Sequence, residues 1–245
     1  MLTYILLSVF IVSLISLIGI ITLSFSHKFL KKILLILVSF AAGALLGEVF
    51  IHLLPEISKA GFTASMAFYI LIGFLLFFIL EKFLHWHHCH DQDCETHNKP
   101  LAAINLVGDA FHNFIDGILI AGSYLVNLTL GITTTIAVLF HEIPQEIGDF
   151  GILLHSGYSK TKAIAYNFLI SLTAFLGAIL TFFIGPLIEN FTSIIIPITA
   201  GGFLYIAGSD LIPELHKETK LSLSLFQILG LILGAFVMFL LTFLE

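Results

Sequence analysis

Long apolar segments separated by short polar stretches run from one end of the chain to the other. Each segment holds about 20 residues or more, enough for one α-helix to cross about 30 Å of hydrocarbon. The expected helices cover approximately residues 2–24, 33–54, 62–84, 100–126, 129–154, 161–184, 191–215 and 222–244. The pattern therefore predicts an all-α integral membrane protein with eight transmembrane helices, in which residues 1–245 form a single transmembrane domain.

Two of these segments contain polar residues near their middle, where a membrane helix is normally apolar. The fourth contains His112-Asn113-Phe114-Ile115-Asp116-Gly117, and the fifth contains His141-Glu142-Ile143-Pro144-Gln145-Glu146. Helical spacing places the polar members of each motif on one face of its helix. An ionisable side chain at bilayer depth costs on the order of 3 kcal/mol. A cation held between the two faces would offset that cost.

Composition supports the assignment to the membrane and argues against nucleic acid as a partner. Hydrophobic residues make up 58% of the chain and charged residues 11%, and the mean hydropathy is +1.08, whereas a soluble domain carries about a quarter charged residues. The net charge of −6 and the lack of arginine argue against a nucleic-acid partner. The first segment has no basic region before it and no small-residue cleavage site, so we interpret it as a retained helix.

The lysines predict the orientation of the helices. All of them except Lys59 fall in connections on one side of the expected bundle. Because cytoplasmic connections are enriched in basic residues, we expect that side in the cytoplasm and both termini outside. The sequence thus predicts a multi-pass protein of the plasma membrane with the connection 85–99 in the cytoplasm.

The second and seventh segments resemble each other. Gly43 and Pro55 recur at the same spacing as Gly201 and Pro213. In the predicted orientation the two segments run in opposite directions, which is typical of the inverted repeats of secondary transporters. We expect helices 1–3 and 6–8 to be copies that enclose helices 4 and 5. Chance recurrence in a low-diversity apolar sequence is the alternative.

The paired polar faces offer ligands that suit a transition metal. His112, Asp116 and His141 supply two imidazoles and a carboxylate, which fit Zn²⁺ and, less selectively, Fe²⁺, Mn²⁺ or Cd²⁺. Asn113, Glu142 and Glu146 add oxygen ligands for a second ion or for hydrated cargo. Mixed and partly weak ligands suit a site that must also release its ion. The alternative is that these residues only hydrogen-bond between helices.

Other polar residues on the predicted helices are weaker candidates. Asp109 shares a face with His112 and is a pathway residue, a partner of a ligand or a plain helix-pairing residue. Candidates for further pathway or scaffold positions are Glu48, His52, Asn167, Ser171 and Asp210. Gly108, Gly117 and Gly148 are expected to allow close approach of the fourth and fifth helices.

The two motifs are similar to those of a known family. HNFIDG followed by HEIPQEIGDFGILLHSGYS strongly resembles the ZIP family of divalent metal transporters, in the branch whose fifth helix carries HEIPHE. GALLGEVFIHLLPE and AGGFLYIAGSDLIPEL are similar to the second and seventh helices of that family. The resemblance implies eight helices with both ends outside, a binuclear metal centre between helices 4 and 5, and uptake into the cytoplasm. It also implies movement of helices 1, 4, 5 and 6 against helices 2, 3, 7 and 8.

The resemblance further implies which residues hold the metals. His112, Asp116, His141 and position 145 would hold the first ion, and Asn113, Asp116, Glu142 and Asn167 would line the neighbouring position, with Glu146 nearby. The chain departs from the family pattern at Gln145, where that branch has histidine. An amide oxygen is a weaker donor to zinc than an imidazole. We therefore expect weaker or broader metal selection than in the HEIPHE form.

The connection between the third and fourth segments is rich in histidine and cysteine. Its candidate ligands are His87, His88, Cys89, His90 and Cys94. Tracts of this composition bind metal, and cysteines in a reducing compartment are not expected to form a disulfide. We interpret residues 85–99 as a cytoplasmic metal-binding loop that accepts or senses incoming ions; a solvated linker is the alternative.

Uptake of divalent transition-metal ions, zinc first, by alternating access is the function that these features favour. We expect no enzymatic activity and no resident cofactor, and as partners the metal ions and the lipid bilayer, with a homodimer as one candidate assembly. An intramembrane zinc metalloprotease is an alternative because His141-Glu142 begins an H-E-x-x-H pattern, although Gln145 occupies its last position. Export of metal ions is the other alternative, because the metal ligands do not determine the direction of transport. An inside-negative potential favours entry of a divalent cation by about 4.6 kcal/mol per 100 mV.

Overall fold

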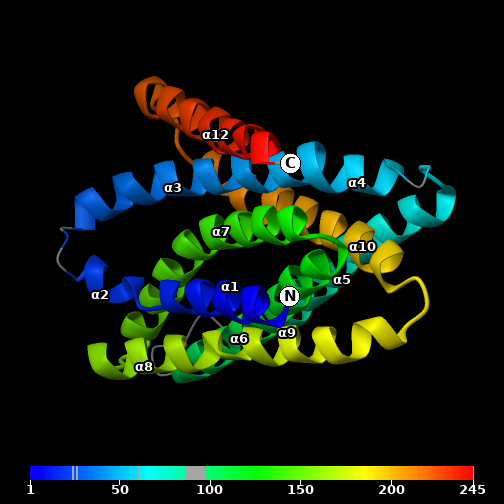
Figure 1. Cartoon of the computed structure of the whole chain (residues 1–245). Helices are drawn as coiled ribbons and strands as arrows, with labels where there is room; N and C mark the ends of the chain where they lie inside the picture. The colour runs from blue at the N-terminus through cyan, green and yellow to red at the C-terminus, as the bar shows by residue number, and fades with distance from the viewer. Residues whose placement is uncertain (24, 26, 60, 86–97, 245) are drawn as a thin grey trace.

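A computed structural model describes residues 1–23, 25, 27–59, 61–85 and 98–244, and within these ranges the chain forms helices and no strand. Figure 1 shows the long helices lying side by side, with their connections gathered at the two ends of the bundle. The connection between α7 and α8 and the beginning of α12 lie at one end, and the connection between α4 and α5 lies at the other.

The predicted helical ranges are confirmed, several of them as consecutive pieces. The first three segments form α1 (Leu2–Ile15) and α2 (Ile18–Thr22), then α3 (His27–Gly47), the π-helix η1 (Glu48–Leu53) and α4 (Leu54–Lys59), then α5 (Ala64–His85). The fourth and fifth segments are the continuous helices α6 (Asn98–Val126) and α7 (Leu128–His155). The last three form α8 (Lys160–Ser171), α9 (Thr173–Ile184) and the 3₁₀-helix η2 (Gly185–Leu187), then α10 (Phe191–Tyr205), the π-helix η3 (Ile206–Leu211) and α11 (Ile212–Leu215), then α12 (Leu221–Leu241) and the 3₁₀-helix η4 (Thr242–Leu244).

The polarity of the bundle is the reverse of that of a soluble protein. Large apolar side chains such as Leu176, Phe183 and Ile232 are more than half exposed, whereas Glu48, Asp116 and Asn167 are fully buried. Six stretches are long and apolar enough to cross a membrane: Leu2–Thr22, Ile33–Lys59, Ala64–Lys82, Lys160–Leu187, Phe191–Leu215 and Leu221–Leu241. Helices α6 and α7 have 29 and 28 residues but carry the polar motifs. The fold is therefore that of an all-helical membrane protein, and the crossing of all eight segments stays a prediction.

The second and seventh segments share an unusual backbone feature. The π-helix η1 begins at Glu48, five residues after Gly43, and η3 begins at Ile206, five residues after Gly201. Both π-helices contain six residues. A π-helix is rare and appears mostly as a single turn inserted into an α-helix, so its presence at the same place in both segments gives the sequence likeness a structural counterpart.

Three helix pairs pack through reciprocal glycine contacts. A β-carbon added at Gly43 of α3 would collide with the carbonyl of Leu231 in α12, and one added at Gly234 of α12 would collide with the carbonyl of Phe40 in α3. The same reciprocal arrangement joins α10 to α5 through Gly201 and Gly73, and α6 to α9 through Gly117 and Gly177. Small residues let helix backbones approach closely in membranes, so these contacts fix which helices pair.

The first and sixth segments meet at two serines. Ser13 Oγ in α1 donates a 3.0 Å hydrogen bond to the carbonyl of Ser171 in α8, and Ser171 Oγ donates one of 3.2 Å to the carbonyl of Ser13. The two serines are 158 residues apart, which is also the separation of Gly43 and Gly201. The two serines therefore occupy positions that the predicted repeat would make equivalent.

The prediction that Gly108, Gly117 and Gly148 allow close approach of α6 and α7 is wrong for Gly117 and Gly148. Gly117 faces the carbonyl of Ala174 in α9, and Gly148 has open space where a β-carbon would lie. Gly108 lines a cavity. The physical reason is that Gly117 lies on the face of α6 that packs against α9, whereas no atom of the described residues lies close enough to Gly148 of α7 for the lack of a side chain to matter.

Candidate metal centre

Four ligand groups from α6 and α7 converge at the centre of the bundle. His112 and Asp116 are one turn apart on α6, and His141 and Glu142 are adjacent on α7. One ligand atom from each lies within 4.8 Å of the other three. Asp116, His141 and Glu142 are at most 1% exposed. The helical spacing read from the sequence therefore does bring these four predicted residues together.

The separations between the ligand atoms match those expected around one metal ion. His112 Nε2 lies 3.2 Å from His141 Nε2 and 3.4 Å from Glu142 Oε1, and His141 Nε2 lies 3.2 Å from Asp116 Oδ2. His112 Nε2 lies 3.8 Å from Asp116 Oδ2, and His141 Nε2 lies 3.7 Å from Glu142 Oε1. Ligands about 2.0–2.1 Å from a tetrahedral zinc ion are about 3.3–3.4 Å apart. The geometry thus suits a tetrahedral ion without rearrangement of the backbone.

A backbone contact orients the imidazole of His141. Its Nδ1 lies 3.2 Å from the carbonyl oxygen of Ala137, one turn earlier on α7. A carbonyl only accepts, so the ring donates from Nδ1, and Nε2 is the atom directed at the other ligand groups. Metal-binding histidines usually make such a bond through the second ring nitrogen. The contact therefore fixes the orientation of the His141 ring.

Several carboxylate oxygens in this region are buried without a hydrogen bond. Both oxygens of Asp116 and Oε1 of Glu142 make no hydrogen bond among the described residues, and only imidazole nitrogens lie close to Asp116 Oδ2 and Glu142 Oε1, at 3.2 Å and 3.4 Å. Buried carboxylates without hydrogen bonds are unfavourable. A divalent cation between the imidazoles and the carboxylates would compensate these charges.

The oxygen and amide residues predicted for a second position lie around the first group. Asn113 Nδ2 donates to Asp109 Oδ1 at 2.7 Å and to its carbonyl at 3.1 Å. Asn167 Nδ2 donates to the carbonyl of Glu146 at 3.3 Å. The Oδ1 atoms of both amides are buried without a partner among the described residues. We call His112, Asp116, His141 and Glu142 the His112 group. The carboxylate of Glu146 clusters with Asp109 and Asp149 instead of with this group.

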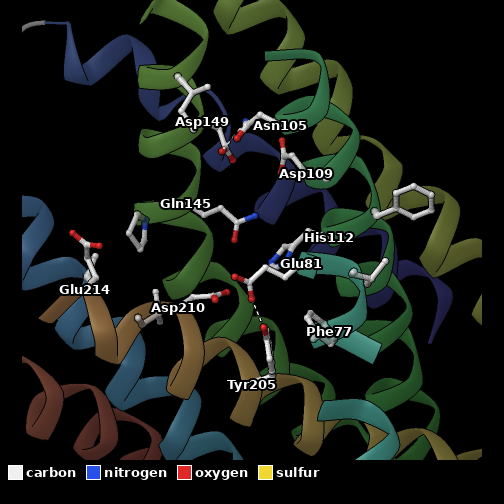
Figure 2. Close-up of a pocket in the computed structure, with 17 residues that line it drawn as sticks. Phe77, Glu81, Asn105, Asp109, His112, Gln145, Asp149, Tyr205, Asp210 and Glu214 are labelled. Carbon is white, nitrogen blue, oxygen red and sulfur yellow. Dashed lines mark hydrogen bonds between the residues drawn. The ribbon is translucent and has the colours of Figure 1, made fainter. Parts of the chain in front are cut away.

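A cavity of about 470 Å³ reaches the His112 group from one side. Figure 2 shows Gln145 extending into it towards His112, with Glu81, Tyr205 and Asp210 on the opposite wall. Tyr205 donates a hydrogen bond to Glu81 there. Gln145, His112 and Asp210 therefore line the same cavity.

The remaining predicted residues lie away from the four ligands. His52 is buried, and its Nε2 lies 2.9 Å from the carbonyl of Met238 in α12. Glu48 Oε1 accepts hydrogen bonds from Thr133 at 3.2 Å and Thr134 at 2.7 Å. These contacts favour scaffold roles for both. The candidate loop ligands His87, His88, Cys89, His90 and Cys94 lie outside the described residues.

Sequence reasoning did not single out Asp149 and its partner Asn105. Asn105 Nδ2 of α6 donates to Asp149 Oδ1 of α7 at 2.9 Å. A signal was present, since Glu142, Glu146 and Asp149 follow each other at helical spacing on α7, and Asn105 precedes Asp109 by four residues on α6.

The fold is that of an all-helical membrane protein with a buried cluster of potential metal ligands, and comparison with known proteins gives the family. A family model described as ZIP zinc transporter matches residues 1–103 and 87–242. The chain belongs to the ZIP zinc transporter family.

Named relatives from animals support the same assignment. The chain is 37% identical over 218 residues to zinc transporter ZIP13 of Pongo abelii, covering 82% of the chain and 65% of that protein. It is 31% identical over 279 residues to the zinc transporter ZIP13 homolog of Drosophila melanogaster, covering 87% and 79%. It is 31% identical over 272 residues to zinc transporter zipt-7.2 of Caenorhabditis elegans, covering 87% and 59%. The chain thus spans about three fifths of the length of two of these relatives.

Proposed function

We propose that the chain carries divalent transition-metal ions, zinc first, through the plasma membrane into the cytoplasm by alternating access. The convergence of two imidazole nitrogens and two carboxylate oxygens within 4.8 Å inside an apolar bundle carries this proposal. The names of the relatives support zinc as cargo. A protease is not favoured, because the family is one of transporters and Gln145 replaces the second histidine of the protease pattern.

The proposed metal centre is binuclear and uses the residues of both polar motifs. His112, Asp116 and His141 hold the first ion, with Gln145 as a weak fourth ligand. The second position lies beside it and uses Asn113, Asp116, Glu142 and Asn167, with Glu146 nearby. The unpartnered amide oxygens of Asn113 and Asn167 support this position.

We propose that transport is directed into the cytoplasm, and the position of the cavity in the bundle supports this direction. The lining residues Glu81 and Glu214 are next to or near Lys82 and Lys217 in the sequence. The cavity therefore joins the His112 group to the end of the bundle that carries most lysines, the expected cytoplasmic end. The loop at 85–99 is connected to the same end and is proposed to accept released ions. The membrane potential makes entry the favourable direction for a cation.

The proposed mechanism uses the inverted repeat of helices 1–3 and 6–8. The matching π-helices, the paired serines and the reciprocal glycine contacts between α3 and α12 and between α10 and α5 support that repeat. One body would contain helices 2, 3, 7 and 8, and the other would contain helices 1, 4, 5 and 6 with the metal centre. Movement of the second body against the first would expose the centre to each side in turn.

Zinc uptake into liposomes tests the proposal. The full chain is reconstituted with a zinc-sensitive dye trapped inside, and an inside-negative potential is imposed. We expect saturable uptake that falls at least about tenfold in His112→Ala and in Asp116→Asn, since even outer partners of metal ligands typically matter about 10–100-fold. Glu189→Gln serves as the matched control, because Glu189 is exposed in the connection between α9 and α10.

Two results would overturn the proposal. One is uptake no faster than in protein-free liposomes. The other is uptake by both ligand variants at the rate of the Glu189→Gln control. Loss of zinc from preloaded liposomes against the imposed potential would instead support export.

A further inference from the structure

A second group of acidic side chains lies beside the His112 group. One carboxylate oxygen from each of Asp109, Glu146 and Asp149 lies within 4.8 Å of the other two. Asp109 belongs to α6, and the other two belong to α7. Figure 2 shows Asp149, Asn105 and Asp109 close together, separated from His112 along the helix axes. We call Asp109, Glu146 and Asp149 the acidic triad.

Buried oxygens without hydrogen bonds point to a missing cation. Glu146 is 1% exposed, and neither of its carboxylate oxygens has a hydrogen-bond partner among the described residues. Oδ2 of Asp109 and Oδ2 of Asp149 are likewise buried and unpartnered. In the described part of the chain, none of the ion pairs joins these carboxylates to a lysine. Three ionised acids at this separation repel one another unless they bind protons or a cation, so the cluster is a candidate cation site.

Neighbouring amides orient the triad. Asn113 Nδ2 donates to Oδ1 of Asp109 at 2.7 Å, and Asn105 Nδ2 donates to Oδ1 of Asp149 at 2.9 Å. Each amide thus occupies one oxygen of its acid and leaves the other oxygen without a partner. An arrangement in which one oxygen is fixed and the other is left for a ligand is the usual support of a metal-binding carboxylate.

The triad lies between the His112 group and the lysine-bearing end of the bundle. Asp109 precedes His112 by three residues on α6, and Asp149 follows Glu142 by seven residues on α7. At about 1.5 Å per residue these offsets are about 4.5 Å and 10 Å in the same direction, because the helices are antiparallel. Asp109, His112 and Asp149 line one continuous cavity.

We propose that the acidic triad is a separate cation site built from oxygen ligands alone, which binds a hard divalent cation of the Mn²⁺ or Mg²⁺ class. Carboxylate oxygens suit these ions, whereas imidazole suits zinc. The site is additional to the His112 group and binds its ion whether or not the chain transports one. A cation leaving the imidazoles towards the lysine-bearing end meets these oxygens next.

Mn²⁺ binding followed by electron paramagnetic resonance tests this site. The full chain carries His112→Ala, Asp116→Ala, His141→Ala and Glu142→Ala, with the histidines and cysteines of residues 85–97 changed to serine, so that the proposed imidazole and carboxylate ligands of the binuclear centre and the proposed ligands of the loop are removed. We expect one Mn²⁺ to remain bound, with no ¹⁴N modulation in the pulsed spectrum. Asp149→Asn or Glu146→Gln in this background should weaken that binding at least about tenfold.

Asp210→Asn is the matched control, because Asp210 lines the same cavity on the opposite wall. It should leave Mn²⁺ binding unchanged, and millimolar Mg²⁺ should compete for the site. Absence of bound Mn²⁺ in the background chain, ¹⁴N modulation from the bound ion, or equal affinity in Asp149→Asn, Glu146→Gln and Asp210→Asn would each overturn the proposal. If the background chain binds Mn²⁺ in this way but the unaltered chain fails in zinc uptake, the transport proposal alone is overturned.

Discussion

At the scale of single residues, the two imidazoles differ in how firmly they are held. His141 is 1% exposed and bonded through Nδ1 to Ala137, whereas the His112 side chain is 16% exposed and borders the cavity. In the proposed metal centre His141 would therefore be the fixed ligand, and His112 would be the ligand that an ion meets first from the cavity. A site that binds and releases its ion needs this combination of a rigid half and an accessible half.

The amide at position 145 gives a prediction about metal selection. Gln145→His would place a third imidazole where Gln145 now extends towards His112 (Figure 2). Imidazole favours zinc over manganese more than an amide oxygen does. We expect the preference for Zn²⁺ over Mn²⁺ in competition uptake to rise about tenfold, which corresponds to about 1.4 kcal/mol. Gln145→Asn is the control, and an unchanged competition profile in Gln145→His would contradict a role of this residue at the ligands.

At the scale of helices, close backbone contact determines which pairs form. Gly177 of α9 lies against the carbonyl of Phe114 in α6, and Gly117 of α6 lies against that of Ala174 in α9. This contact presses the back of α6 against α9 and leaves its opposite face, with His112 and Asp116, directed at α7. The glycine contact therefore helps to set the orientation of the α6 face that carries the proposed ligands.

A substitution in this contact should be costly. Gly177→Ala adds a methyl group into the backbone of α6, and overpacking of this kind costs about 1–3 kcal/mol. We expect a lower midpoint of thermal unfolding in detergent, measured by loss of the monodisperse protein peak. Gly151→Ala in α7 is the matched control, because nothing lies within 4 Å of the added methyl group and alanine favours a helix by about 1 kcal/mol over glycine. Equal midpoints in the two variants would show that the close packing does not matter.

The helix positions and the convergence of His112, Asp116, His141 and Glu142 could be predicted from the sequence, whereas the other contacts of these helices could not. The apolar runs predict helices because a segment in lipid must satisfy its own backbone, whatever it packs against. His112 and Asp116 share a face because helical spacing is local. The partner of Gly117 depends on packing between distant segments, so the prediction that it meets α7 was wrong. The link between Asn105 and Asp149 joins two helices and likewise depends on their register, although the spacing on each helix indicated a polar face.

At the scale of the whole molecule, the close contacts fall into two groups. The glycine contacts of α3 with α12 and of α10 with α5 lie within the proposed body of helices 2, 3, 7 and 8. The contact of α6 with α9 lies within the proposed body of helices 1, 4, 5 and 6. Between the bodies the described contacts include side chains, such as the edge-to-face rings of Phe40 and Phe140, whose centroids are 4.6 Å apart. Side-chain contacts can exchange during a movement more readily than backbones in direct contact.

Crosslinking across and within the bodies tests this division. Cys89 and Cys94 are first replaced by serine, and cysteine pairs are then introduced at Phe40 with Phe140 or at Ser39 with Gly230. Phe40 and Phe140 belong to different bodies, whereas Ser39 and Gly230 lie within one, and a β-carbon added at Gly230 would be 3.0 Å from that of Ser39. A short bifunctional thiol reagent should stop zinc uptake by the first pair and leave uptake by the second unchanged, with uncrosslinked protein of each pair as the control. Because alternating access requires relative movement of the bodies, full uptake by the crosslinked first pair would show that the metal centre moves against some other boundary.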